Sequence, residues 1–66
     1  MYYKIEITGG QFNGYERYYK TLGTARRVAK TYLKKDCQKC IGCQTFADIY
    51  EIDKNYKTKL IETYDN

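Results

Sequence analysis

The start of the chain, Tyr2–Thr8, alternates between two faces. Ile5 and Ile7 fall on one face of an extended segment, with charged and polar residues between them. This period of two predicts a half-buried strand over Tyr2–Thr8. The segment 9–14 is rich in Gly and Asn and predicts a hairpin loop. The aromatic segment 15–20 then predicts the returning strand of the hairpin.

The middle of the chain changes to a helical period. Apolar residues recur at helical spacing between Leu22 and Leu33, and Arg or Lys occupies many of the remaining positions. Thr21 is a good N-cap residue. Lys34 and Lys35 suit the negative end of a helix dipole. We therefore expect one amphipathic helix from about Thr21 to about Lys35.

Two more strand-like segments close the chain, at Thr45–Asp53 and Lys57–Tyr64, and a turn joins them. Alternation does not settle which face of the first segment is inward, because Asp48 interrupts one apolar row and Glu51 interrupts the other. The predicted order of elements is ββαββ. This order predicts an α+β fold, in which a small antiparallel or mixed sheet packs against one helix.

The size and charge of the chain restrict its class. With 66 residues, we expect a single domain, 1–66, with a thin core that a bound metal ion would help to hold. The net charge of +4 allows contact with nucleic acid without requiring it. The chain starts with charged residues instead of a signal peptide, and no apolar run approaches the roughly 20 residues of a membrane span. We therefore expect a cytoplasmic protein.

All three cysteines lie in one short stretch with the spacing Cys-x-x-Cys-x-x-Cys, at Cys37, Cys40 and Cys43. Zinc takes four ligands in a tetrahedron, and clustered thiols in a reducing compartment favour metal over a disulfide. The adjacent Asp36 is a candidate fourth ligand. Asp48, a water molecule or a thiolate from another copy would also serve. The sequence therefore predicts a zinc site at this stretch.

Three other interpretations of the cysteines stay open. An iron–sulfur cluster is the rival metal, although the bacterial ferredoxin pattern needs a further Cys followed by Pro. A redox pair is disfavoured, because these thiols follow a helix C-terminus, where the dipole disfavours a thiolate. Finally, a continued helix would make them small apolar side chains, since positions i, i+3 and i+6 span only about 120° of helix surface.

Nine tyrosines in 66 residues are more than so small a core can bury. Exposed Tyr beside Arg is typical of protein-binding hot spots, and Tyr also stacks on single-stranded bases. Tyr is also a common strand residue, which accounts for part of the excess. The candidate partner-binding residues are Tyr15, Arg17, Tyr18, Tyr19, Arg26 and Arg27. Because Tyr15 and Tyr19 share one strand face and Tyr18 takes the other, one of these sets is expected to point outward.

The sequence contains no recognisable catalytic constellation. Both His and Ser are absent, and the Gly9-Gly10 pair opens a hairpin instead of a phosphate-binding loop. We therefore expect a protein that is not an enzyme.

The Gly-broken hairpin, the segments Thr21–Lys30 and Ala47–Asp53, and the cysteine cluster resemble small proteins encoded by bacteriophages and mobile elements. Among these, the chain resembles zinc-binding anti-CRISPR proteins that block the RNA-guided nuclease of type II systems. This resemblance covers the whole chain in architecture. It implies a stoichiometric inhibitor that binds a protein in the bacterial cytoplasm, with Cys37, Cys40 and Cys43 as zinc ligands. The alternative is a small zinc-containing nucleic-acid-binding protein that uses the basic helix and the tyrosines.

Overall fold

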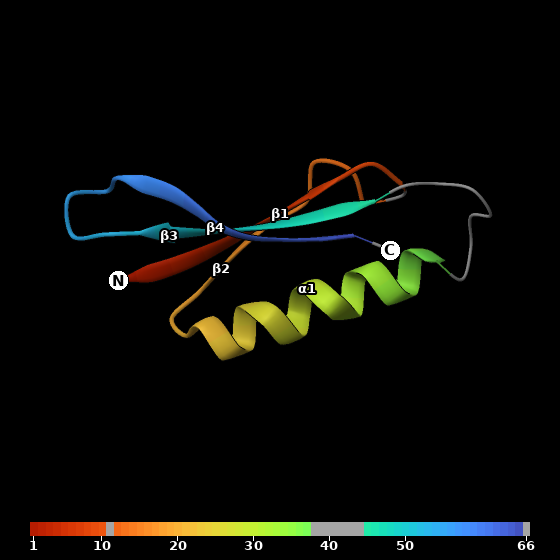
Figure 1. The fold of residues 1–66 in the computed structure, drawn as a ribbon, viewed down its shortest axis with the longest axis horizontal. Helices are drawn as coiled ribbons and strands as arrows, with labels where there is room; N and C mark the ends of the chain where they lie inside the picture. Colours follow the sequence, from red (N-terminus) through yellow and green to blue (C-terminus); the bar gives the residue numbers. More distant parts are fainter. Residues whose placement is uncertain (11, 38–44, 66) are drawn as a thin grey trace.

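The structure of the protein is a computed structural model that describes residues 1–10, 12–37 and 45–65. Its elements are β1 (Tyr2–Thr8), β2 (Glu16–Tyr19), α1 (Leu22–Cys37), β3 (Phe46–Ile52) and β4 (Thr58–Asp65). The strands form one sheet in the order β2-β1-β3-β4, and every neighbouring pair is antiparallel. Helix α1 lies along one side of this sheet (Figure 1). The predicted α+β class and ββαββ order are confirmed, and the sheet is antiparallel.

The first hairpin turns where the glycines are. Gly9, Gly10 and Gly14 all have positive φ, a conformation that glycine adopts without steric cost. The Gly14 amide donates to the Ile7 carbonyl at 2.8 Å, which closes the hairpin. The Asn13 side chain accepts a hydrogen bond from the Gly9 amide at 2.8 Å. These two bonds help to hold the turn that returns the chain antiparallel to β1.

Helix α1 begins at the predicted cap. The Thr21 hydroxyl accepts a hydrogen bond from the Thr24 amide at 3.3 Å, which satisfies one of the unpaired donors of the first turn. Lys34 and Lys35 lie in the last turn as expected, and the helix ends at Cys37, two residues beyond the predicted end.

The core lies between α1 and the two central strands. Its fully covered side chains are Ile5, Ile7, Ala25, Ala29, Leu33, Ala47 and Ile49. The helical members are four residues apart and form one stripe, and two of them are alanines. Small side chains let the helix approach the sheet closely, so the isoleucines of β1 and β3 fill the space beneath it.

The pairing with β1 decides which face of β3 is inward. Ile49 lies opposite Ile5, and Ala47 lies opposite Ile7, so all four side chains point toward α1. The other row of β3 therefore points away from the helix. We call this helix-free surface of the sheet the open face. By register, its residues are Tyr2, Lys4, Glu6, Thr8, Glu16, Tyr18, Phe46, Asp48, Tyr50, Ile52, Thr58, Leu60, Thr63 and Asp65.

A β-bulge separates the two halves of β4. The register shifts between Ile49 and Tyr50, so Glu62 lies opposite Ile49 and Leu60 lies opposite Tyr50, with Ile61 as the extra residue. Ile61 packs against the core, and Glu62 also points to the helix side.

Among the described residues, no helix is long and apolar enough to cross a membrane.

Candidate functional site

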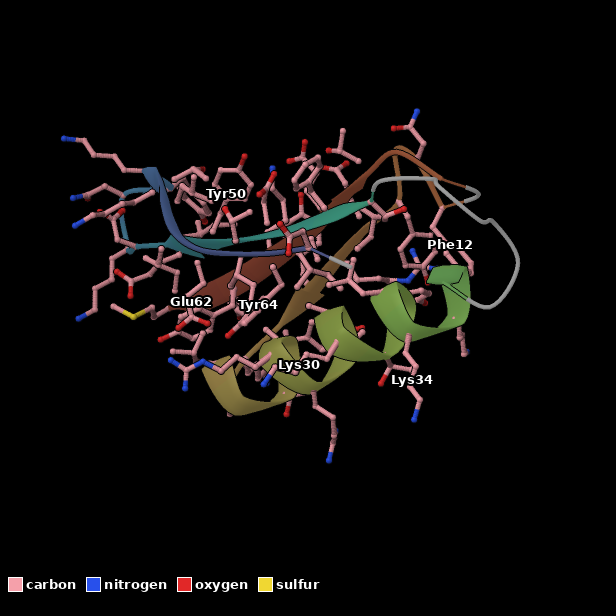
Figure 2. All side chains as sticks on the ribbon, turned by 45° about the vertical axis from the view of Figure 1, so that its right-hand side comes forward. Phe12, Lys30, Lys34, Tyr50, Glu62 and Tyr64 are labelled. Carbon is pink, nitrogen blue, oxygen red and sulfur yellow. The ribbon has the colours of Figure 1, made fainter. Side chains whose placement is uncertain are left out.

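The open face carries large side chains that the fold leaves in solvent. Tyr18 is 60% exposed, and Tyr2 and Leu60 are each 50% exposed. The strand register aligns one row across the sheet, from β2 to β4: Tyr18, Lys4, Tyr50 and Leu60. Tyr2 and Ile52 lie opposite each other in the next row. Figure 2 shows Tyr50 on the side of the sheet away from α1.

Lys4 is held in place at the centre of this face. Its Nζ lies 3.2 Å from a carboxylate oxygen of Glu6 and 3.4 Å from one of Glu16. The same ammonium lies 5.0 Å from the centroid of the Tyr50 ring. Burial alone would lower the pKa of Lys4, but the hydrogen bonds to Glu6 and Glu16 together have the larger effect and raise the pKa of Lys4. The central charge is therefore paired within the surface, and its side chain is only 18% exposed.

Carboxylates dominate the next row of the open face. Glu16 lies opposite Glu6, Glu6 lies opposite Asp48, and Asp48 lies opposite Thr63. The Thr63 hydroxyl donates a hydrogen bond to Asp48 at 2.9 Å. These carboxylates outnumber the single amine of Lys4, so this part of the face is acidic although the chain as a whole is basic. Such a surface repels phosphate groups and suits a basic partner.

The turn between β3 and β4 presents one more aromatic side chain. The Asp53 carboxylate accepts hydrogen bonds from the amides of Asn55 at 2.8 Å and Lys57 at 3.0 Å, which braces the turn. The Tyr56 amide donates to the Asp53 carbonyl at 3.0 Å. Tyr56 has a φ of 62°, and its side chain is 86% exposed. This is the hairpin position that normally carries Gly, and Tyr56 occupies it without burying its ring.

A polar cluster on the helix side joins α1 to β4. Arg26 Nε lies 2.9 Å and 3.0 Å from the two carboxylate oxygens of Glu62, and Tyr64 donates a hydrogen bond to the same carboxylate. The hydrogen bond from Arg26, and then that from Tyr64, lower the pKa of Glu62 to about 2. The ammonium of Lys30 lies 5.3 Å from the Tyr64 ring centroid, and Figure 2 shows Lys30 below Tyr64 and Glu62. This cluster fixes the helix to the edge strand.

An aromatic cluster closes the other end of the helix. The Tyr32 hydroxyl donates to the Tyr15 hydroxyl at 2.5 Å, and the hydrogen bond raises the pKa of Tyr32 to about 12. Phe12 meets Tyr32 edge-to-face, with ring centroids 5.0 Å apart. Figure 2 shows Phe12 beside the C-terminal end of α1. The guanidinium of Arg17 lies 4.4 Å from the Tyr15 ring centroid. The cluster therefore holds the first hairpin against the helix.

The structure separates the partner-binding residues predicted from the sequence. Tyr18 is the one that lies on the open face, whereas Tyr15 and Tyr19 pack against the core. Arg26 is paired with Glu62, Arg17 stacks on Tyr15, and Arg27 is exposed on the outer side of α1. Local sequence patterns do not place Tyr2, Tyr50 and Leu60 beside Tyr18. Their common face follows from strand register, which local alternation does not give.

The predicted zinc site lies mostly beyond the described residues. Cys37 is the last residue of α1 and Asp36 precedes it, while Cys40 and Cys43 fall outside the described residues. Within the described ranges, no group of three or more metal-ligating side chains could hold a metal ion. Zinc at Cys37, Cys40, Cys43 and Asp36 therefore stays a prediction.

Comparison of the chain with protein-family models, with curated proteins and with solved structures finds no match.

Proposed function

We propose that the chain is a non-enzymatic protein-binding module that docks on its partner through the open face. The observation that carries this proposal is the set of large side chains that the fold leaves half or more exposed on one surface: Tyr18, Tyr2 and Leu60. Aromatic side chains bury much area on binding and are enriched in interface hot spots. Several large apolar side chains exposed together lower the solubility of a protein, and such patches are typical of surfaces that bind a partner.

The centre of the open face is also suited to binding because its charged side chain is already held in place. Its side chains stand on an antiparallel sheet, and the central Lys4 is fixed by two carboxylates and the Tyr50 ring. A surface that is ordered before binding loses little conformational entropy when a partner covers it. The adjacent carboxylates Glu6, Glu16 and Asp48 would steer a partner whose contacting surface is basic.

The resemblance to zinc-binding anti-CRISPR proteins supplies a particular partner, the RNA-guided nuclease of type II systems. In this proposal the zinc ion is structural. Cys37, Cys40 and Cys43 would hold it at the C-terminal end of α1, and it would stabilise the thin domain without taking part in chemistry. The support for this partner and for the metal is the architecture and the cysteine spacing.

The test compares a variant of the open face with a variant of the helix. Tyr18→Ser removes an exposed anchor, and Lys34→Ser changes the opposite side of the domain. Truncating an interface anchor costs about 2 kcal/mol, which is about thirtyfold in affinity. Titration calorimetry against the purified nuclease should show this loss for Tyr18→Ser and unchanged binding for Lys34→Ser. Binding by Tyr18→Ser with wild-type affinity would refute docking through the open face.

The outer side of α1 favours one alternative, a nucleic-acid-binding protein. Arg27 and Lys34 are exposed there, and the first turn of the helix carries no acidic residue. Phosphate contacts release counterions, so affinity for a single-stranded oligonucleotide would fall steeply with salt. A steep slope that flattens in Lys34→Ser, with Tyr18→Ser binding as the wild type, would favour this alternative over the protein-binding proposal.

A further inference from the structure

The hairpin of β3 and β4 carries exposed lysines at its turn. Residues 54–59 contain three lysines and no carboxylate, and the side chains of Lys54, Lys57 and Lys59 are all exposed. We call these lysines together with Tyr56 the basic tip. No ion pair of the described residues involves any of the three ammonium groups. In Figure 1 the turn, drawn in light blue, extends past the start of α1, so an anionic partner can reach it without displacing the helix.

Two carboxylates lie behind the basic tip. Asp53 accepts hydrogen bonds from the amides of Asn55 at 2.8 Å and Lys57 at 3.0 Å, so its charge is directed into the turn. Glu51 lies opposite Lys59 in the strand register, and both carboxylate residues are less exposed than the lysines. A partner that approaches from solvent therefore meets the positive charges first.

Tyr56 stands among these lysines with its ring in solvent. Its φ of 62° lies in the left-handed region, which is unusual for a bulky residue, and its side chain is 86% exposed. The Tyr56 amide donates to the Asp53 carbonyl at 3.0 Å, so the turn holds the backbone beneath the ring. Unfavourable backbone conformations gather at functional sites, where a ligand uses the side chain that they present. The ring is therefore a candidate platform for stacking.

The turn does not form a pocket for a single phosphate group. The amides of Asn55, Tyr56 and Lys57 all donate within the turn, so they are not available to hold an anion. Phosphate contacts at the basic tip would come from lysine ammonium groups, which act as point charges on flexible stems. A chain of several phosphates therefore fits the tip better than a free phosphate does.

We propose that the basic tip binds a single-stranded nucleic acid. Tyr56 stacks on one unpaired base, and the lysines Lys54, Lys57 and Lys59 contact the neighbouring phosphates. Single strands are held without sequence preference by this combination of an aromatic platform and basic side chains that follow the backbone. Bases in a duplex are already stacked and leave no free face for the ring. This proposal does not rest on the proposed function, because the basic tip and the exposed anchors of the open face are different residues.

An anionic membrane is the other partner that lysines and a tyrosine fit. Binding at a membrane interface grows with the apolar area that enters it. Tyr56 is the one aromatic residue in the segment 54–59, where the other residues are Lys, Asn and Thr. A single ring supplies little area for a membrane, whereas one ring is sufficient to stack on a base. The composition of the tip therefore favours the single strand.

Fluorescence anisotropy with labelled oligonucleotides tests the proposal on the full chain. The probes are single strands of about 12 nucleotides, one of deoxythymidylate and one of uridylate, and a duplex of the first with its complement. The protein is titrated from about 1 µM to about 1 mM at low salt, which covers the range of non-specific binding. We expect a single strand to bind more tightly than the duplex, and the tighter of the two strands identifies the sugar. Binding of neither strand, or equal binding of the duplex, would overturn the proposal.

Substitutions of Tyr56 test the stacking. Tyr56→Phe keeps the ring and should bind as the wild type does. Tyr56→Ala should bind at least about fivefold more weakly, because a stacked base is lost. Tyr18→Ala removes an exposed ring from the open face and is the matched control, with binding unchanged. Circular dichroism verifies that the variants are folded. Wild-type affinity in Tyr56→Ala, or an equal loss in Tyr18→Ala, would overturn the proposal.

Substitutions of lysine test the phosphate contacts. Each contact with a single strand contributes about 0.7 to the slope of log affinity against log salt, so three contacts give a slope of about −2. Lys57→Gln should make this slope shallower by about 0.7, whereas Lys34→Gln on α1 is the matched control and should keep the wild-type slope. A slope that changes in Lys34→Gln but not in Lys57→Gln would place the strand on the helix and overturn the proposal.

Vesicles of phosphatidylserine and phosphatidylcholine supply the last comparison. We expect the protein to stay in the supernatant when the vesicles are sedimented at a salt concentration at which a single strand still binds. Sedimentation with the vesicles, together with no binding of either strand, would assign the basic tip to a membrane surface and overturn the proposal.

Discussion

The most direct test of the structure is a substitution expected to make the protein more stable, Tyr56→Gly. Tyr56 occupies the left-handed region with a φ of 62°, where a residue with a Cβ pays about 1–2 kcal/mol. Glycine adopts this conformation without steric strain. Its greater conformational freedom in the unfolded chain, however, lowers the free energy of unfolding by about 0.5–1 kcal/mol, which offsets part of the gain. The side chain is 86% exposed, so its removal forfeits little burial.

The balance is a gain of about 0.5–1 kcal/mol, which for a domain of this size raises the melting temperature by about 2–8 °C. Tyr56→Ala is the matched control, because it removes the ring but keeps the Cβ and should leave the melting temperature nearly unchanged. Both variants are measured by thermal and urea denaturation at low protein concentration, so that self-association does not contribute. A glycine variant no more stable than the alanine variant would refute the reasoning about this turn.

Three further outcomes are expected. Ile49→Val removes one methylene group from a fully buried site and should lower the free energy of unfolding by about 0.5–1.5 kcal/mol, as measured by urea denaturation. Ile52→Val on the open face should lower it by less. Equal losses of stability would contradict the assignment of the two faces. Because the pKa of Glu62 is lowered to about 2 from its ordinary 4.5, its contribution to stability is present above about pH 4.5 and is lost as the pH falls toward 2. Melting temperatures of wild type and Glu62→Gln should therefore converge over this interval, and a constant difference would contradict the ion pair with Arg26. Native mass spectrometry should show one zinc ion per chain, and a chelator should remove it. The variant Cys40→Ser should bind no zinc and should be less stable than the wild type. A wild-type protein without metal would contradict the predicted site.

Much of the fold could be predicted from local patterns. The period of two at Tyr2–Thr8 matches β1 without a change of bounds, and Thr21 caps the helix as its side chain suggested. These features depend on neighbours within a few residues, which the sequence displays directly. The predicted alternation along the second strand-like segment is also confirmed, because Tyr15 and Tyr19 pack toward the core while Tyr18 points outward.

The candidate site depended on contacts between distant segments. Each row of β3 contains apolar residues and a carboxylate, so alternation could not choose its inner face. Pairing of Ile49 with Ile5 made that choice, and it placed Tyr50 and Tyr18 in one row across three strands. Arg26 appeared free in the sequence, but its partner Glu62 lies 36 residues away along the chain. Strand register and helix docking bring such residues together, because the burial of the isoleucines and alanines in one core fixes the orientation of every other side chain on the sheet.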